Sequence, residues 1–169
     1  GLHETRTKVV FGVGNSDARL MFIGEGPGRD EDLQGEPFVG RAGRLLTKII
    51  QAMGYQREDV YIANAVKCRP PQNRDPKTGE IEACRHFLMD QVALIQPDVI
   101  VLLGRSAVGA VLGLSAPLSK LRGTFRDWNG TKVMCTYHPA YLLRNPSAKG
   151  MVWEDMQLVR DKLAATTEN

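Results

Sequence analysis

Short apolar runs alternate along this chain with longer amphipathic stretches, and this alternation constrains the fold more than any other feature of the sequence. Such a pattern is typical of a parallel sheet whose two faces are both covered by helices. The expected strands are residues 19–24, 60–66, 98–104 and 132–137. The expected helices are residues 41–53, 80–95, 106–112 and 151–164. We therefore expect an α/β fold with a central four-stranded parallel sheet flanked by helices on both faces.

The length and composition indicate one ordinary globular domain spanning residues 1–169. Hydrophobic residues make up 43% of the chain and charged residues 24%, which are globular averages and exclude a disordered or low-complexity chain. The formal charge of +3 permits an anionic partner without requiring one. Residues 117–129 are expected to form a short antiparallel segment beside the parallel strands, with a turn at Asn129 and Gly130.

The sequence gives no sign of a membrane segment or of export. No apolar run approaches the ~20 residues that a spanning helix needs, and the opening stretch GLHETRTKVV has no apolar core of the kind found in signal peptides. We expect a cytoplasmic protein that acts as a monomer. An odd number of cysteines then disfavours a disulfide framework. Cys135 lies in an expected strand and reads as a buried apolar residue, while Cys68 and Cys84 alone cannot complete a four-ligand metal site.

Polar residues gather where the expected strands end, which is where ligands bind in sheets of this class. The first strand leads into GEGPG, where Glu25 stands between glycines that bring the backbone close to a ligand. The alternative is a tight turn whose acidic residues cap the next segment. Asn64 is an amide in an apolar strand, and its carbonyl and amine complement the N3–H and O4 of uracil. A structural Asn bonded to neighbouring backbone is the other reading.

Two further loops carry candidate binding residues. Phe38 lies in QGEPFVG, where it either stacks on a planar ring or plugs the edge of the core. His138 follows the last strand and opens HPAYLLRNP, in which Leu142 and Arg144 are candidates for wedging a duplex. Both loops are bounded by prolines or glycines, which fit a rigid recognition loop.

Three segments together resemble one known family. GEGPGRDEDLQGEPFVGRAG, NAVKCRPPQNRDP and YHPAYLLRNP occur in the order found in the iron–sulfur (family 4) uracil-DNA glycosylases, and the resemblance covers nearly the whole chain. These enzymes belong to the uracil-DNA glycosylase superfamily and hydrolyse the bond between uracil and deoxyribose in DNA. The resemblance implies a DNA repair glycosylase that acts on uracil in single- and double-stranded DNA.

The resemblance also implies roles for individual residues. Gly26 through its backbone and Phe38 by stacking are expected to line the uracil pocket, and Asn64 to read the base edge. Glu31 is expected beside C5 of uracil, where it obstructs a thymine methyl group. His138 is expected to hydrogen-bond O2 as the base departs. Glu25 is expected to position the water or steady the sugar cation, and Leu142 or Arg144 to fill the gap left by the flipped nucleotide.

A [4Fe-4S] cluster is implied by the same resemblance. Cys68 and Cys84 match two of the four cysteine ligands of the family. The family's other two lie in a Cys-x-x-Cys pair, and we expect the chain printed here to begin just after that pair, at Gly1. The cluster is expected to pin the loop of residues 70–77 near DNA rather than to take part in the reaction.

Two alternative hypotheses for the function are compatible with the sequence. One is a non-catalytic module of the same fold that binds uracil or damaged DNA. The other is an α/β enzyme acting on free nucleosides or nucleotides. Formation of abasic sites in uracil-containing DNA separates the repair enzyme from both.

Overall fold

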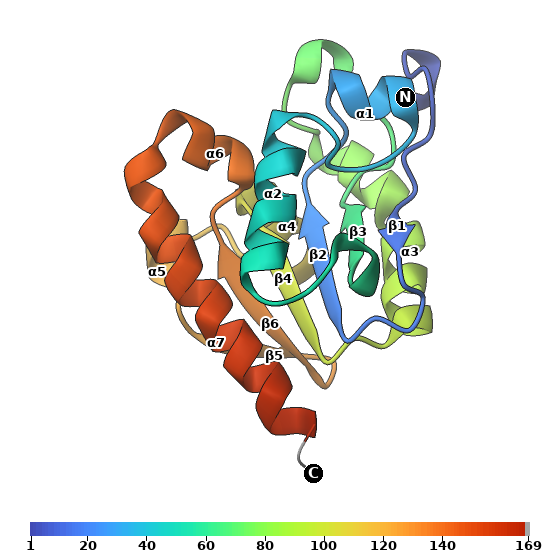
Figure 1. Cartoon of the computed structure of the whole chain (residues 1–169). Helices are drawn as coiled ribbons and strands as arrows, with labels where there is room; N and C mark the ends of the chain where they lie inside the picture. The colour runs from blue at the N-terminus through green and yellow to red at the C-terminus, as the bar shows by residue number, and fades with distance from the viewer. Residues whose placement is uncertain (168–169) are drawn as a thin grey trace.

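A computed structural model describes residues 1–167 of the chain as one six-stranded sheet with helices on both faces (Figure 1). The strand order is β1-β3-β2-β4-β6-β5. The four central strands run parallel to one another, as the sequence predicts. They are β3 (Tyr61–Asn64), β2 (Leu20–Gly24), β4 (Val99–Leu103) and β6 (Thr131–Thr136).

Two antiparallel edge strands complete the sheet and exceed the predicted strand count. The first, β1 (Val13–Gly14), pairs with β3, and β5 (Phe125–Trp128) pairs with β6. The β5–β6 hairpin turns at Asn129 and Gly130, whose φ angles of 49° and 82° lie in the left-handed region that this type of turn requires. The antiparallel segment expected from the sequence is therefore confirmed, and the short strand β1 was missed because two residues carry no periodic pattern.

Strand residues alternate between two apolar layers, which explains why each central strand reads as a continuous hydrophobic run. In β2, Leu20 and Phe22 pack in a core shared with α2 (Arg41–Ala52) and α7 (Lys149–Thr167). Met21 and Ile23 point to the opposite face. That second core is closed by three helices: α3 (Thr78–Ile95), α4 (Arg105–Leu112) and α5 (Leu118–Leu121).

The long helices fall within a few residues of the ranges expected from the sequence, whereas three short ones were not predicted. Besides α5 these are α1 (Arg29–Gln34) and α6 (Pro139–Arg144), each six residues long. Four 3-10 turns lie at Leu2–Glu4, Arg57–Asp59, Pro71–Asn73 and Pro146–Ala148. Helices this short show too little apolar periodicity to be recognised by pattern. Among the described residues, no helix combines the length and the apolarity needed to cross a membrane.

The order in which strands are added to the sheet reverses between β2 and β4. From β2 the chain moves to β3 on one side, and later strands are added on the other side, beyond β4. In open α/β sheets, ligands bind outside the carboxyl ends of the strands at such a switch point. The topology thus singles out the loops that follow β2 and β4 as the place for a site.

Candidate active site

A cavity of about 1150 Å³ lies at this switch point, against the carboxyl ends of the central strands. Every parallel strand sends the segment that follows it to the cavity wall. Residues from these four segments that line it are Glu25, Gly26, Pro70, Arg74, Asp75, Gly104, Ser106, Tyr137 and His138. The clustering of strand-end loops that the sequence predicts is therefore confirmed.

Glu25 follows directly on β2 and is held from the other side of the switch point. Its Oε2 accepts a hydrogen bond from Ser106 Oγ at 2.7 Å, and Ser106 lies in the first turn of α4. Burial raises the pKa of the Glu25 carboxyl; the Ser106 hydrogen bond opposes that shift, and the charge of Asp75 adds to it. A partly buried carboxylate with a raised pKa is a common feature of catalytic sites.

Asn64 and Phe38 meet over Gly24, but neither lines the cavity, and Phe38 packs in the core as its alternative interpretation expected. A Cβ added at Gly24 would lie 2.5 Å from Phe38 Cζ and 2.6 Å from Asn64 Oδ1, so only glycine fits between them. Asn64 is 2% exposed, and its Oδ1 is buried with no hydrogen-bond partner among residues 1–167. A buried polar atom without a partner costs free energy unless a ligand supplies one. This oxygen is free to accept a hydrogen bond from a ligand.

The loop that carries Phe38 is pinned in a strained conformation. Phe38 has a φ of 52°, which is uncommon for a residue with a side chain. A Cβ at Gly43 would lie 1.9 Å from the Phe38 carbonyl oxygen, so the glycine permits helix α2 to approach the loop. Glu31 fixes the loop from the other side, since its carboxylate accepts N–H bonds from Gly28, Val39 and Gly40 at 2.8–3.0 Å.

Glu31 thus caps helix α1 through the N–H of Gly28, as the alternative interpretation of the acidic turn expected, and its bonds to Val39 and Gly40 add a structural task that the sequence did not suggest. It also lines the cavity. Its expected position beside C5 of a bound uracil stays a prediction.

His138 caps helix α6 and faces Phe38. Its Nδ1 accepts the N–H of Ala140 at 3.0 Å, and its ring stacks on Phe38 with 5.4 Å between centroids and 28° between planes. Burial, aided by the charge of Arg144, lowers the pKa of His138 to about 4. The imidazole is therefore neutral at pH 7 with its proton on Nε2.

Gly26 lines the cavity with bare backbone. A Cβ at this position would lie 2.6 Å from Val66 Cγ2, so a side chain would clash with the segment after β3. The backbone of residue 26 can therefore approach a ligand closely.

Helix α6 corrects one expectation from the sequence. Leu142 is 1% exposed and packs in the core, so it is not an exposed wedge, and its assignment to DNA is wrong for this structure. Arg144 is exposed and lines the cavity, as does Tyr141, whose ring stacks on Tyr137 with 4.9 Å between centroids. The error arose because a six-residue amphipathic helix was read as a loop, in which adjacent leucines have no core to face.

Comparison with known proteins places this arrangement in a family. The model of the uracil DNA glycosylase superfamily matches residues 11–157. A type-4 uracil-DNA glycosylase of Thermotoga maritima is 52% identical over 92% of this chain and 83% of its own length. Type-4 enzymes of Archaeoglobus fulgidus and Saccharolobus solfataricus are 47% and 44% identical, over 88% and 97% of this chain and 78% and 80% of theirs.

The chain belongs to the type-4 uracil-DNA glycosylases. Membership confirms the expected α/β class and the expected function of a monofunctional glycosylase in DNA repair.

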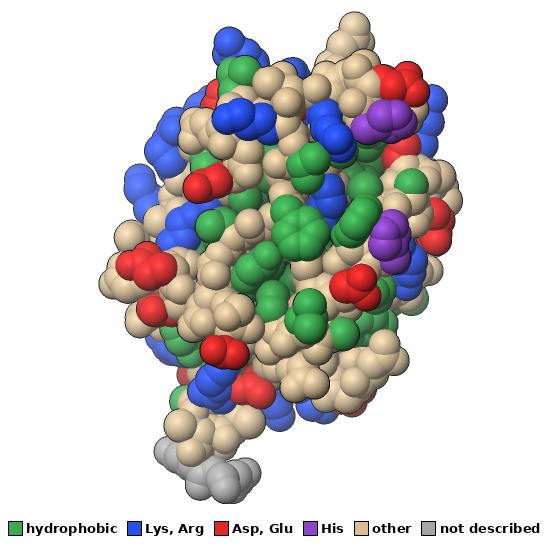
Figure 2. Space-filling model, turned by 90° about the vertical axis from the view of Figure 1, so that its right-hand side faces the viewer, with side chains coloured by type: hydrophobic (Ala, Val, Ile, Leu, Met, Phe, Trp, Pro, Cys, Tyr) green, Lys and Arg blue, Asp and Glu red, His purple; other side chains and the backbone are tan. Residues whose placement is uncertain are grey.

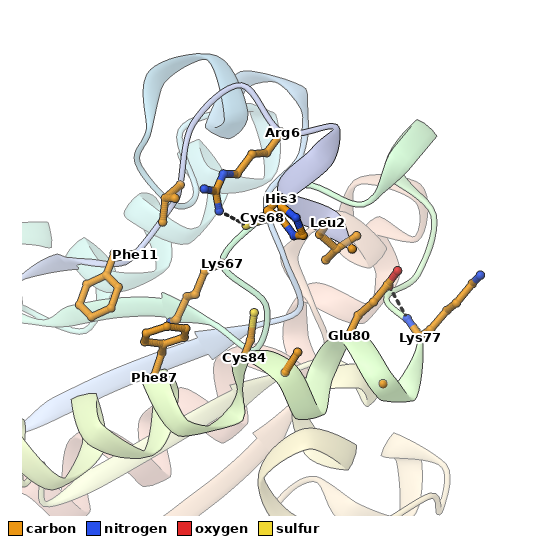
Figure 3. A pocket seen from close by; sticks show the side chains of 14 residues that line it. Leu2, His3, Arg6, Phe11, Lys67, Cys68, Lys77, Glu80, Cys84 and Phe87 are labelled. Carbon is orange, nitrogen blue, oxygen red and sulfur yellow. Dashed lines mark hydrogen bonds between the residues drawn. The ribbon is translucent and has the colours of Figure 1, made fainter.

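A second cavity of this uracil-DNA glycosylase, of about 760 Å³, contains both candidate cluster ligands. It is hollowed in a face of the molecule where hydrophobic side chains gather (Figure 2), among them the partly exposed Val9, Phe11 and Phe87. Cys68, after β3, and Cys84, on α3, both line it (Figure 3).

The walls of this second cavity suit anionic sulfur. Arg6 Nη1 donates to Cys68 Sγ at 3.0 Å, drawn as a dashed line in Figure 3. Burial lowers the pKa of Lys67 to about 8, and the charge of Cys84 opposes that shift. Two thiols, two cations and apolar walls fit half of the ligand set of an iron–sulfur cluster. Within residues 1–167 no group of three or more His, Cys, Asp or Glu side chains could hold a metal ion, so these residues supply only part of such a site.

Sequence reasoning missed the residues that hold the glycosylase site residues in place. Ser106 binds Glu25, and the Lys67 ammonium donates to the backbone carbonyl of Asn64 at 2.9 Å and to Gln91 Oε1 at 2.6 Å. The position of Ser106 just after the third parallel strand was a usable signal. Gln91 had none, because it lies mid-helix and reaches the site only through the packing of α3.

Proposed function

We propose that this chain flips uracil out of DNA and hydrolyses its N-glycosidic bond, releasing free uracil and leaving an abasic site. The observation that carries the proposal is the buried Oδ1 of Asn64, which has no partner among the described residues. It lies beside an aromatic ring at the switch point of the sheet. Enzymes that act on a base inside a duplex extrude it into such a pocket and read its edge by hydrogen bonds and stacking.

Uracil is the base whose edge fits Asn64. The N3–H of uracil supplies the donor that Oδ1 lacks, and the amide nitrogen donates to O4. Cytosine presents the reverse pair, which would leave two buried polar groups unpaired. Phe38 stacks on the ring, the backbone of Gly26 contacts the base edge, and Glu31 lies near C5 and excludes thymine.

His138 stabilises the departing base. Its Nδ1 is occupied by the N–H of Ala140, which leaves Nε2–H to donate to O2 of uracil as negative charge develops there. Donors preorganised in this way contribute about a hundredfold to a thousandfold in rate. Because the pKa of His138 is about 4, the ring stays neutral and keeps this donor through the physiological pH range.

Glu25 acts on the sugar side of the bond. In its ionised form the carboxylate positions the attacking water or steadies the oxocarbenium-like sugar. The pKa of Glu25 is raised, so the carboxylate takes up a proton at a higher pH than a free Glu does. As pH falls through that pKa, the ionised form is lost and excision slows.

DNA is held over the cavity by the exposed face of α6, where Arg144 fills the gap that the flipped nucleotide leaves or binds phosphate. The proposal includes action on single- and double-stranded DNA as a monomer and a cytoplasmic location. Phosphate contacts make the affinity fall as salt rises.

The cysteine cavity is the proposed place of a [4Fe-4S] cluster. Cys68 and Cys84 would hold it from this chain's described residues, and two further cysteines are needed. When bound, such a cluster supplies a covalent crosslink rather than chemistry, and it would fasten the segment of residues 70–77 that lines the DNA side of the active site.

A strand-cleavage assay tests the proposed function. The protein is incubated with an oligonucleotide that carries one uracil, and alkali then cleaves at abasic sites. We expect cleavage at the uracil in single strands and in duplexes, and none with thymine or cytosine at that position. Binding without abasic product would instead support a non-catalytic module, and release of uracil from deoxyuridine but not from DNA would support a nucleoside enzyme.

A further inference from the structure

The hydrogen bond between Ser106 and Glu25 spans the switch point of the sheet. It joins residues 81 positions apart in the sequence, one after β2 and one after β4. Within the described chain it is the only side-chain hydrogen bond that Glu25 makes. It therefore sets the orientation of that carboxylate.

The turn that carries Ser106 also shapes the histidine side of the site. Gly104 has a φ of +91°, and a Cβ there would lie 3.1 Å from His138 Cβ. Its N–H donates to the carbonyl of Thr136 at 2.9 Å, which fastens the turn to the end of β6. One turn thus contacts both the histidine and the carboxylate of the proposed mechanism, and it keeps their separation fixed.

The Ser106 hydroxyl does not cap helix α4. Ser, Thr, Asp and Asn near a helix start commonly cap the first backbone N–H groups. The N-cap of α4 is Gly104, without a side-chain cap, and the Ser106 hydroxyl points to Glu25. The hydroxyl therefore serves the site rather than the stability of the helix.

We infer that Ser106 is a positioning residue for Glu25: its hydroxyl holds Oε2 and thereby directs Oε1 toward the water or the sugar. This inference rests on the proposed function and adds to it a residue that does not itself touch the substrate. The bond also favours the ionised carboxylate, since a donor to the charged form lowers a pKa.

The surroundings of Glu25 disfavour its ionised form, which the Ser106 hydrogen bond stabilises. Burial raises the pKa of Glu25, the nearby charge of Asp75 raises it further, and Ser106 lowers it. Other charged or titratable side chains that line the same cavity are Glu31, Arg74, Arg105, Tyr137, His138, Tyr141 and Arg144. Removal of the Ser106 hydroxyl leaves the two raising effects, so the carboxylate takes up its proton at a higher pH.

Single-turnover kinetics on uracil-containing single-stranded DNA test the inference in wild type and Ser106→Ala. A hydrogen bond to a charged group accounts for about tenfold to a hundredfold in an equilibrium. We expect the maximal rate of excision to fall by that factor, with little change in the enzyme concentration that gives the half-maximal rate. The acidic limb of the pH–rate profile is expected to move to higher pH. Ser106→Thr retains a hydroxyl and is expected to restore both the rate and the limb.

A double-mutant cycle with Glu25→Gln shows that the effect passes through the carboxylate. In the Glu25→Gln background, Ser106→Ala is expected to cost little more, because the amide has no charge to hold. Ser16→Ala, at the opposite end of the strands, is the matched control and is expected to behave as wild type.

Distinct results overturn the inference and the proposed function. A folded Ser106→Ala protein with wild-type rate and pH profile, alongside an impaired Glu25→Gln, overturns the inference and leaves the proposed function standing. A Ser106→Thr protein that is folded yet as slow as Ser106→Ala also overturns it. A fully active Glu25→Gln protein instead overturns the role of Glu25 in the proposed function.

Discussion

The two cavities of this glycosylase differ in how far their own residues complete them. In the active-site cavity, Ser106 from the segment after β4 binds Glu25 from the segment after β2, and His138 is held by the backbone N–H of Ala140 in its own segment. In the cysteine cavity the walls are mainly apolar, and Cys68 and Cys84 are the only cysteines on it. The polar groups of the first cavity are thus fixed by hydrogen bonds within the protein, whereas among the described residues the two thiols of the second supply only part of a metal-ligand set.

A buried lysine links the cysteine cavity to the end of β3. Lys67 is 3% exposed, lines the cysteine cavity, and donates to the backbone carbonyl of Asn64. A buried ammonium needs partners, and those observed are neutral oxygens of Asn64 and Gln91 together with the ring of Phe11, 5.6 Å away. The end of β3, which carries the proposed base-reading residue, is therefore supported from the cysteine cavity.

The largest effect is expected at Asn64, the proposed base-reading residue. Asn64→Ala removes both hydrogen bonds to uracil and is expected to lower kcat/KM by about a hundredfold to a thousandfold while the protein stays folded. Excision kinetics and circular dichroism measure the two properties. Asn15→Ala, an exposed residue far from the cavity, is the control. A wild-type rate for Asn64→Ala would remove the base-reading argument.

The next effect concerns stability rather than catalysis. Leu142→Ala leaves a hole in the core and is expected to reduce the free energy of unfolding by about 2–5 kcal/mol, as measured by urea denaturation. Leu143→Ala, at a half-buried neighbour, is expected to cost less. Unchanged stability with weakened excision from duplexes would contradict the burial of Leu142 and return it to the DNA-contacting residues.

A third substitution tests whether the cysteine cavity affects stability rather than the rate of excision. With the proposed cluster bound, Cys68→Ser is expected to lower the iron content and the melting temperature of the protein, because one ligand and its bond to Arg6 are lost. Excision well below the melting temperature is expected to change by less than about tenfold. Cys135→Ser, in the core away from the cavity, is the control for iron content. A loss at Cys68 as large as that at Asn64 would place the cysteines in the catalytic machinery.

The smallest effect is expected at the rim of the active-site cavity. Arg144→Gln removes one cation near DNA and is expected to reduce the slope of log affinity against log salt by about one. Fluorescence anisotropy with a labelled duplex at several salt concentrations measures it. Lys162→Gln, near the far end of α7, is the matched charge control. Equal slopes for Arg144→Gln and wild type would show that α6 does not contact phosphate.

The sequence predicted the main elements of the fold and the polar residues at the strand ends, but not the burial of residues in short helices. The central strands are continuous apolar runs and the long helices are periodic, so pattern alone located them. Glu25, Asn64 and His138 stand out because a polar residue at the end of a buried strand has no packing reason to be there. Leu142 was misjudged because burial in a short helix depends on the tertiary contact with α2, which no local pattern records.

Supporting contacts were the least predictable part of the site. The bonds of Glu31 to the backbone of Val39 and Gly40 arise from a chain reversal, and the bond of Ser106 to Glu25 depends on the order of strands in the sheet. Such contacts follow from the order of the strands. The sequence predicted a parallel sheet but not the order of its strands.

A structure of the protein bound to free uracil tests the central claim most directly. The account predicts the base stacked on Phe38, with N3 of uracil within hydrogen-bond distance of Asn64 Oδ1 and O2 facing Nε2 of His138. An empty cavity at saturating uracil, or a base bound with Asn64 Oδ1 still unpartnered, would contradict it.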